Sequence, residues 1–283
     1  MQALIQRSAA ALISAAFALA ASSALAQTRA ECEKNYKPQV GQAGKDVVWV
    51  PTPDELVARM LRMAQVTSKD IVFDLGAGDG KIAIAAGKVG ATATGIEYNS
   101  DMAKLAQCFV KAEGVGDKVR IIEGDIFKED FSKATVITMY LLPELNLRLR
   151  PTILNMRPGT RVTSHQFTMG EWEPDEKAEM DYRTAYLWIV PAKAAGTWTF
   201  KDANGATFTA NLAQTFQKLS GDVMVGSAKQ PLVGATLRGE EIRFAFNDDK
   251  GVTRSLTGTV RGNEINGTLR GGGADAKVTG TRK

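Results

Sequence analysis

Side chains that bind transition metals are scarce in this sequence. Its 283 residues include one His and two Cys. Cys32, Cys108 and His165 lie far apart along the chain and form none of the closely spaced pairs that mark zinc sites. We therefore predict no metal site in this protein.

Long apolar segments are missing after the first residues, so the remainder of the sequence predicts no membrane-spanning helix. The N-terminal segment has the parts of a secretory signal: Arg7, an apolar run over residues 9–21, and Ala24-Leu25-Ala26, which fits the small-x-small cleavage rule. A membrane anchor is the alternative, but the run is rich in Ala and shorter than the ~20 apolar residues of a span. We predict that residues 1–26 are a signal peptide and that the mature chain is exported, to the periplasm.

The two Cys residues leave two interpretations open. In an oxidising compartment, Cys32 and Cys108 would be able to form one disulfide between the N-terminal arm and a helix. Cys108 lies in an apolar helical pattern, however, where a buried free thiol is common. The pattern favours the free thiol.

Charge of one sign is not concentrated. The formal net charge is +4, and all of that excess follows Gly196, because the chain up to that residue carries equal numbers of basic and acidic side chains. A nucleic-acid-binding protein would show a dense basic face, so no nucleic-acid partner is expected. A weak attraction to an anionic envelope surface is compatible with this charge.

The sequence predicts two domains, residues 27–192 and residues 197–283. In the first, short β-branched runs alternate with helical patterns, which is typical of βαβ units around a mostly parallel, Rossmann-like sheet. The expected strands are 71–75, 92–97, 119–123, 135–141, 161–165 and 185–190, and the expected helices are 53–63, 81–89 and 101–113. Thr52 is the expected N-cap of the first helix, with Pro53 at its first position.

After residue 196 the helical period disappears and glycine-containing turns recur at short intervals. Apolar and polar residues alternate in segments such as 241–246 and 255–260, as half-buried strands require. About seven short strands are expected, so the C-terminal domain is predicted to be a small all-β barrel or sandwich.

A glycine-rich turn carries the strongest chemical signal. Asp74, Gly76, Gly78 and Gly80 form a D-x-G-x-G-x-G run between an expected strand and an expected helix. Glycines let the backbone approach a ligand, and the following helix offers free N–H groups. Dinucleotide-binding folds use G-x-G-x-x-G instead. The run resembles motif I of class I S-adenosylmethionine-dependent methyltransferases, in which the acid and the loop hold the methionine part of the cofactor.

Two further acids follow neighbouring strands. Glu97 ends the second expected strand, where its carboxylate is placed to accept hydrogen bonds from ribose hydroxyls. Asp125 follows the third strand, and the resemblance implies that an acid there faces the adenine amino group. An N-cap role is an equally good interpretation of Asp125 by itself.

Three residues near the ends of the fourth and fifth strands are the candidate catalytic groups: Tyr140, Glu144 and His165. In-line methyl transfer needs positioning and exclusion of water rather than a covalent nucleophile. If the acceptor is a lysine, its pKa of about 10.4 must fall, which a dry pocket near Tyr140 and Glu144 would favour. Glu144 is equally well explained as a first-turn helix acid. For His165 a structural role is favoured over a catalytic one, because a lone histidine is more often structural.

Several segments together resemble a narrow branch of class I enzymes: Trp49-Val50-Pro51-Thr52-Pro53, the Asp74–Gly80 run, Gly95-Ile96-Glu97-Tyr98-Asn99, and Trp172-Glu173-Pro174. That branch is the lysine methyltransferases acting on mitochondrial membrane proteins, including the c-ring protein of ATP synthase, and their prokaryotic relatives. The resemblance implies S-adenosyl-L-methionine as cofactor, a protein lysine as acceptor, and closure of Thr52 over the cofactor.

Two features depart from that branch: the β-rich C-terminal domain and the expected export. They leave open a small molecule or a lipid, in place of a protein such as an envelope protein, as methyl acceptor. They also leave open a non-catalytic envelope binding protein built on a methyltransferase scaffold. The intact Asp74, glycines and Glu97 argue against this last alternative.

Overall fold

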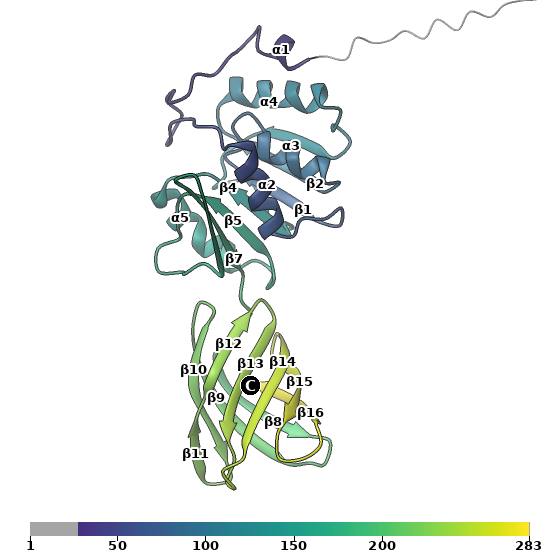
Figure 1. Cartoon of the computed structure of the whole chain (residues 1–283), viewed down its shortest axis with the longest axis vertical. Helices are drawn as coiled ribbons and strands as arrows, with labels where there is room; N and C mark the ends of the chain where they lie inside the picture. The colour runs from purple at the N-terminus through teal and green to yellow at the C-terminus, as the bar shows by residue number, and fades with distance from the viewer. Residues whose placement is uncertain (1–27, 283) are drawn as a thin grey trace, which may run out of the picture.

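The computed structural model describes residues 28–282, and the expected signal peptide at residues 1–26 lies outside this range. The chain forms an α/β unit followed by an all-β unit (Figure 1). Within residues 28–282, no helix is both long and apolar enough to cross a membrane.

The α/β unit is built on a seven-stranded sheet with the order β3-β2-β1-β4-β5-β7-β6. The first five strands in that order are parallel. At one edge, β7 runs antiparallel to β5, and β6 runs antiparallel to β7. The strands are β1 (Ile71–Leu75), β2 (Thr92–Glu97), β3 (Val119–Glu123), β4 (Val136–Met139), β5 (Arg161–His165), β6 (Glu176–Met180) and β7 (Arg183–Ile189). The Rossmann-like sheet predicted from the sequence is confirmed. Strand β6 was not predicted, because its sequence, EKAEM, is short and mostly charged.

Helices cover both faces of this sheet. They are α1 (Arg29–Cys32), α2 (Asp54–Met63), α3 (Lys81–Lys88), α4 (Ser100–Ala112) and α5 (Pro143–Leu154). The capping role expected of Thr52 is wrong, because Pro53 is the N-cap of α2 and no side chain caps it. The Thr52 hydroxyl instead contacts His165 across the unit. The extent of helix α5, which contains Pro151, was not predicted. Its start agrees with the interpretation of Glu144 as a first-turn helix acid.

Alternate residues of the central strands enter two apolar clusters, one on each face. Val72 packs in the cluster with α2, α3 and α4, and its neighbour Phe73 packs in the cluster with α5. This period of two is that of a strand buried on both sides. The sheet is thereby fixed in register, and the carboxyl ends of its parallel strands meet along one rim.

A disulfide joins Cys32 of α1 to Cys108 of α4. The free thiol favoured from the sequence is therefore wrong. Helix α1 packs on α4, where Arg29 pairs with Glu113 at 2.5 Å and lies over the Phe109 ring at 4.3 Å. The apolar pattern around Cys108 reflects the packing of α4 on β2 and β3, and α1 is too short to show a pattern of its own.

The all-β unit has nine strands, eight of which close into an antiparallel barrel through the pairing of β9 with β10. The strands are β8 (Gly196–Asp202), β9 (Thr207–Thr215), β10 (Lys218–Val225), β11 (Ala228–Pro231), β12 (Val233–Arg238), β13 (Glu241–Asn247), β14 (Thr253–Arg261), β15 (Glu264–Arg270) and β16 (Ala276–Arg282). Aromatic side chains, among them Trp198, Phe200 and Phe244, fill the interior. Of the two predicted architectures, barrel and sandwich, the structure has the barrel. The barrel has eight strands rather than about seven, and the short arm β11 pairs with β10 as a ninth.

Candidate active site

A pocket opens at the rim formed by the carboxyl ends of β1, β2 and β4. The glycine turn after β1 forms the floor of this pocket, and residues 42–52, which precede α2, also line it. Open α/β sheets bind ligands at such a rim. The pocket gathers most of the residues that the sequence singled out: Thr52, Asp74, Gly76, Gly78, Glu97, Asp125 and Tyr140.

The glycine turn requires glycine for two physical reasons. Gly76, Gly78 and Gly80 have φ values of 76°, 55° and 78°, in the left-handed region that other residues rarely adopt. A Cβ atom on Gly76 would lie 2.8 Å from Leu141 Cδ2, and one on Gly78 would lie 2.9 Å from Trp49 Nε1. Gly80, which does not line the pocket, is the N-cap of α3. The backbone therefore forms the pocket floor.

Asp74 presents a buried carboxylate to this floor. Its side chain is 2% exposed, and Oδ1 accepts a hydrogen bond of 2.7 Å from the Thr138 hydroxyl. Within residues 28–282, Oδ2 has no hydrogen-bond partner. Burial raises the pKa of Asp74 to about 7, although the Thr138 hydrogen bond acts in the opposite direction. An unpaired buried carboxylate is costly, so this position favours a cationic ligand.

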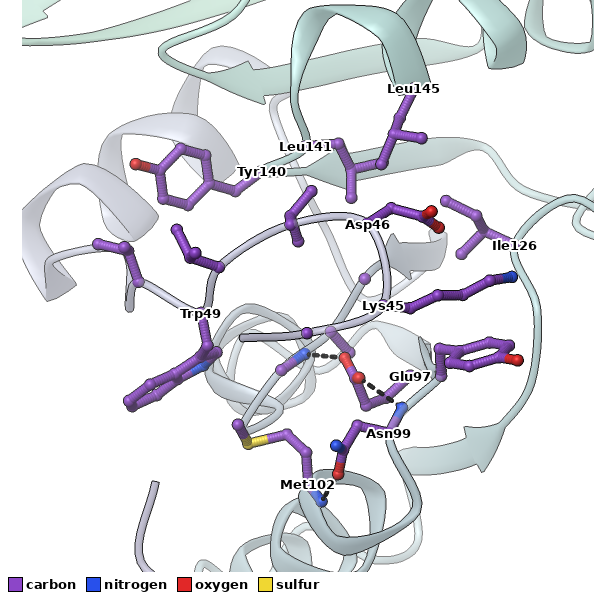
Figure 2. A pocket seen from close by; sticks show the side chains of 18 of the residues that line it. Lys45, Asp46, Trp49, Glu97, Asn99, Met102, Ile126, Tyr140, Leu141 and Leu145 are labelled. Atoms are coloured by element: carbon purple, nitrogen blue, oxygen red, sulfur yellow. Dashed lines mark hydrogen bonds between the residues drawn. The ribbon is translucent and has the colours of Figure 1, made fainter. Parts of the chain in front are cut away.

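Glu97 is fixed by two backbone amides. Gly78 N donates to Oε2 and Asn99 N donates to Oε1, both at 2.8 Å (Figure 2). The Asn99 side chain in turn accepts from Met102 N at 2.9 Å and caps α4. Each carboxylate oxygen keeps a second lone pair. Glu97 is thus a rigid acceptor that lines the pocket.

A short hairpin at residues 41–49 covers the pocket beside Glu97. Its strands are joined by hydrogen bonds from Gly41 N to Trp49 O at 2.8 Å and from Trp49 N to Gln42 O at 2.9 Å. At its tip, Lys45 Nζ lies 3.3 Å from Asp125 Oδ2 and 4.0 Å from the centre of the Tyr98 ring. Figure 2 shows Lys45 extended past Glu97 at the mouth of the pocket. Sequence reasoning missed Lys45, because no motif surrounds it.

Asp125 combines the two interpretations that the sequence left open. Its Oδ1 accepts a hydrogen bond from Phe127 N at 3.0 Å, which stabilises the turn after β3, while the residue also lines the pocket. The Phe127 amide, followed by Lys45, holds the pKa of Asp125 below its usual value. Asp125 is therefore an ionised acceptor at the pocket edge.

Of the three candidate catalytic residues, only Tyr140 lines the pocket. The His165 ring lies behind it, with ring centres 3.8 Å apart, and His165 Nδ1 lies 3.0 Å from Thr52 Oγ1. Burial, with Arg183 nearby, lowers the pKa of His165 to about 4, and burial raises the pKa of Tyr140. Glu144 is exposed in the first turn of α5 and does not line the pocket. Catalytic roles for all three stay predictions.

These features fit S-adenosylmethionine. The unpaired Asp74 carboxylate suits a ligand that carries an ammonium and a sulfonium, and the glycine turn leaves room for backbone contact. The oxygens of Glu97 and Asp125 lie along the pocket as acceptors for a ribose and an adenine amino group. The pocket therefore has a matching group for each polar part of the cofactor.

Comparison with known proteins agrees with this geometry. Residues 74–176 match the model of the ANTKMT methyltransferase domain. The chain is 40% identical over 151 residues to a protein-lysine N-methyltransferase of Saccharolobus islandicus, which covers 51% of this chain and 94% of that protein. It is 30% identical over 128 residues to a Xenopus laevis lysine N-methyltransferase named for the c-ring protein of ATP synthase, covering 45% of this chain and 56% of that protein.

Among solved structures, an RNA methyltransferase from Salinibacter ruber in complex with S-adenosyl-L-homocysteine is 45% identical, with a TM-score of 0.50 over 51% of this chain and 95% of that one. Its ligand is the product form of the same cofactor. The chain therefore belongs to the same methyltransferase family as the Saccharolobus islandicus protein and is an S-adenosylmethionine-dependent methyltransferase.

Proposed function

We propose that this enzyme N-methylates lysine side chains of protein substrates. The observation that carries the proposal is the pair of aromatic rings at the pocket wall beyond the glycine turn. The rings of Tyr140 and Phe167 both line the pocket, with centres 6.1 Å apart and planes inclined by 22°. Such a wall suits the methylene stem of a lysine. The relatives from Saccharolobus islandicus and Xenopus laevis, both named as lysine methyltransferases, support the same acceptor.

The surroundings of Tyr140 favour an uncharged acceptor amine. When bound, S-adenosylmethionine supplies an electrophilic methyl group, which an acceptor nitrogen takes by in-line displacement while the sulfur keeps the electrons of the broken bond. A lysine must first lose its proton, and apolar burial lowers the pKa of an amine. The buried His165 is neutral at physiological pH because its pKa lies at about 4. Tyr140 orients the amine and excludes water, and solvent takes the proton.

Tyr140 variants test this role. We expect Tyr140→Leu to lower kcat/KM for methyl transfer to poly-L-lysine by about 100-fold through lost positioning. The affinity for S-adenosylmethionine, measured by calorimetry, should change less than kcat/KM, because Asp74, the glycine turn and Glu97 are unchanged in the variant. Tyr140→Phe keeps the ring and retains most of the activity. Equal activity of Tyr140→Leu and the wild type would refute the positioning role.

We further propose that the enzyme acts outside the cytoplasm, in the periplasm. The signal-like composition of residues 1–26 supports export. The disulfide between Cys32 and Cys108 also supports it, since such bonds persist in oxidising compartments. Cell fractionation with mass spectrometry tests the proposal: the periplasmic form should start near Gln27 and resist thiol alkylation until reduced. An uncleaved, alkylatable chain in the cytoplasm would overturn it.

A further inference from the structure

A loop at residues 166–175, named here the acceptor-side loop, connects the end of β5 at the pocket rim to the start of β6. At its start, Phe167 lines the pocket and faces Tyr140. At its end, the chain enters β6, where Glu176 pairs with Leu187 of β7. Because Leu187 also pairs with Thr163, the middle residue of β5, the loop begins at the pocket rim and ends partway along the sheet.

Helix α5 holds the first part of this loop by its carbonyl groups. Asn146 Nδ2 donates to Phe167 O at 3.3 Å and to Thr168 O at 3.2 Å. One turn later, Arg150 Nη1 donates to Met169 O at 2.8 Å. Three successive carbonyls are thus fixed by two side chains on one face of α5, and Ser164 Oγ also donates to Phe167 O at 2.7 Å. Asn146 and Arg150 therefore share with Ser164 the placing of Phe167.

The barrel contacts the same loop through the turn between β9 and β10. The Phe216 ring stacks on Trp172 of the loop, with centres 6.2 Å apart and planes inclined by 16°, and Arg150 Cζ lies 5.5 Å from the centre of the Phe216 ring. Beside it, Gln217 Nε2 donates to Glu173 O at 2.7 Å. One barrel turn therefore touches the loop and also the arginine that holds it.

Phe216 occupies an unusual position for an aromatic residue. Thr215 pairs with Lys218, so Phe216 and Gln217 form a two-residue hairpin turn, and Phe216 has a φ of 54°. Glycine, asparagine and aspartate are the usual residues there, and a bulky side chain at positive φ is strained. The packing of the ring on the fully buried Trp172 offsets that strain. The contact of its ring with Trp172, rather than a preference for the turn conformation, therefore explains a phenylalanine at this position.

We propose that this barrel turn fixes the acceptor-side loop, and that Phe216 is a positioning residue for binding of the methyl acceptor. Without the ring, water reaches Trp172 and Arg150 loses one of its two contacts. Phe167 then samples more conformations, and the acceptor must bear the cost of ordering it. The inference rests on the proposed lysine acceptor for its activity readout, whereas the ordering of the loop is independent of that function.

The test compares Phe216→Ala with Phe208→Ala in the full chain. Phe208 is a matched control because its ring stacks on Phe200, at 4.7 Å between centres, near the opposite end of β9. Hydrogen exchange of the amides at residues 166–170 is measured in both variants. We expect faster exchange in Phe216→Ala only, and wild-type protection in Phe216→Tyr, which keeps the ring.

The second readout is methyl transfer to poly-L-lysine. We expect Phe216→Ala to raise the KM for poly-L-lysine by roughly three- to thirtyfold, with S-adenosylmethionine affinity and kcat changed by less than about twofold. Wild-type exchange at residues 166–170 in Phe216→Ala, or equal changes in both variants, would overturn the inference. A wild-type enzyme that leaves poly-L-lysine unmethylated would count against the proposed acceptor instead, and the exchange result would then decide the inference alone.

Discussion

The two units of this protein bury different kinds of side chain. Within residues 28–282, every buried polar or charged side chain belongs to the α/β unit, and Asp70, Asp74 and His165 are among them. The barrel buries apolar side chains only, such as Phe200, Phe244 and Phe246. Buried polar groups cost free energy unless they are paired, so a fold retains them where they serve recognition or chemistry.

Within the α/β unit, two buried aspartates differ in how completely their carboxylates are paired. Asp70 is paired with Arg161 and accepts a hydrogen bond of 2.7 Å from Thr135, and these partners outweigh burial and hold its pKa below the usual value. Asp74 has one partner and a raised pKa. The pKa values of these two buried aspartates, at opposite ends of β1, are thus shifted in opposite directions. Asp74, the incompletely paired one, lies in the pocket.

The largest effect on stability should come from the barrel core. We expect Phe244→Ala to lower the free energy of unfolding of the barrel by about 4 kcal/mol, because it leaves a cavity among packed aromatic rings. Cofactor affinity should stay at its wild-type value. Chemical denaturation monitored with and without S-adenosylmethionine measures both. A matched loss of cofactor binding would show that the two units are not energetically separate.

The disulfide should act on the other unit. We expect the double variant Cys32→Ser, Cys108→Ser to lower the free energy of unfolding of the α/β unit by about 3 kcal/mol, since the bond closes a long loop. The barrel transition should not move. Denaturation of the oxidised and reduced wild type is the control: reduction should reproduce the shift of the double variant, and an unchanged α/β transition would refute the expectation.

The unpaired carboxylate should dominate cofactor binding. We expect Asp74→Ala to weaken S-adenosylmethionine binding by about 100-fold, which corresponds to about 2.7 kcal/mol. Asp101→Ala, an exposed acid in the first turn of α4, is the control and should bind normally. Calorimetric titration checks the pair. Equal affinities of the two variants would remove Asp74 from the site.

The smallest effect expected is that of pH on the same group. The pKa of Asp74 is raised to about 7, so the carboxyl of the free enzyme is mostly protonated below that pH. A cationic ligand prefers the ionised form, and affinity should therefore rise by up to about tenfold between pH 6 and 7, then level off. Titrations across this range measure it. A flat profile would mean that Asp74 is already ionised.

The sequence predicted what depends on local pattern. The glycine turn, Glu97 and the parallel strands follow from residues close together in the chain, and the structure places them as expected. The contacts of Lys45 and Phe216 were not predictable, because each depends on a partner far along the chain: Asp125 for the first and Trp172 for the second. The disulfide was misjudged for the same reason. The local sequence specifies the glycine turn that forms the floor of the cofactor pocket. The hairpin that covers the pocket and the barrel turn that contacts the acceptor-side loop depend on tertiary packing.

The most direct test of the central claim is the chemical identity of the methylated product. Purified enzyme is incubated with S-adenosylmethionine carrying a labelled methyl group and an envelope extract that contains protein, lipid and added RNA, and each fraction is then separated and hydrolysed. The account predicts that the label is recovered as N-methylated lysine from the protein fraction and is absent with Asp74→Ala. Label recovered from RNA or from solvent-extractable lipid, with none in lysine, would contradict it.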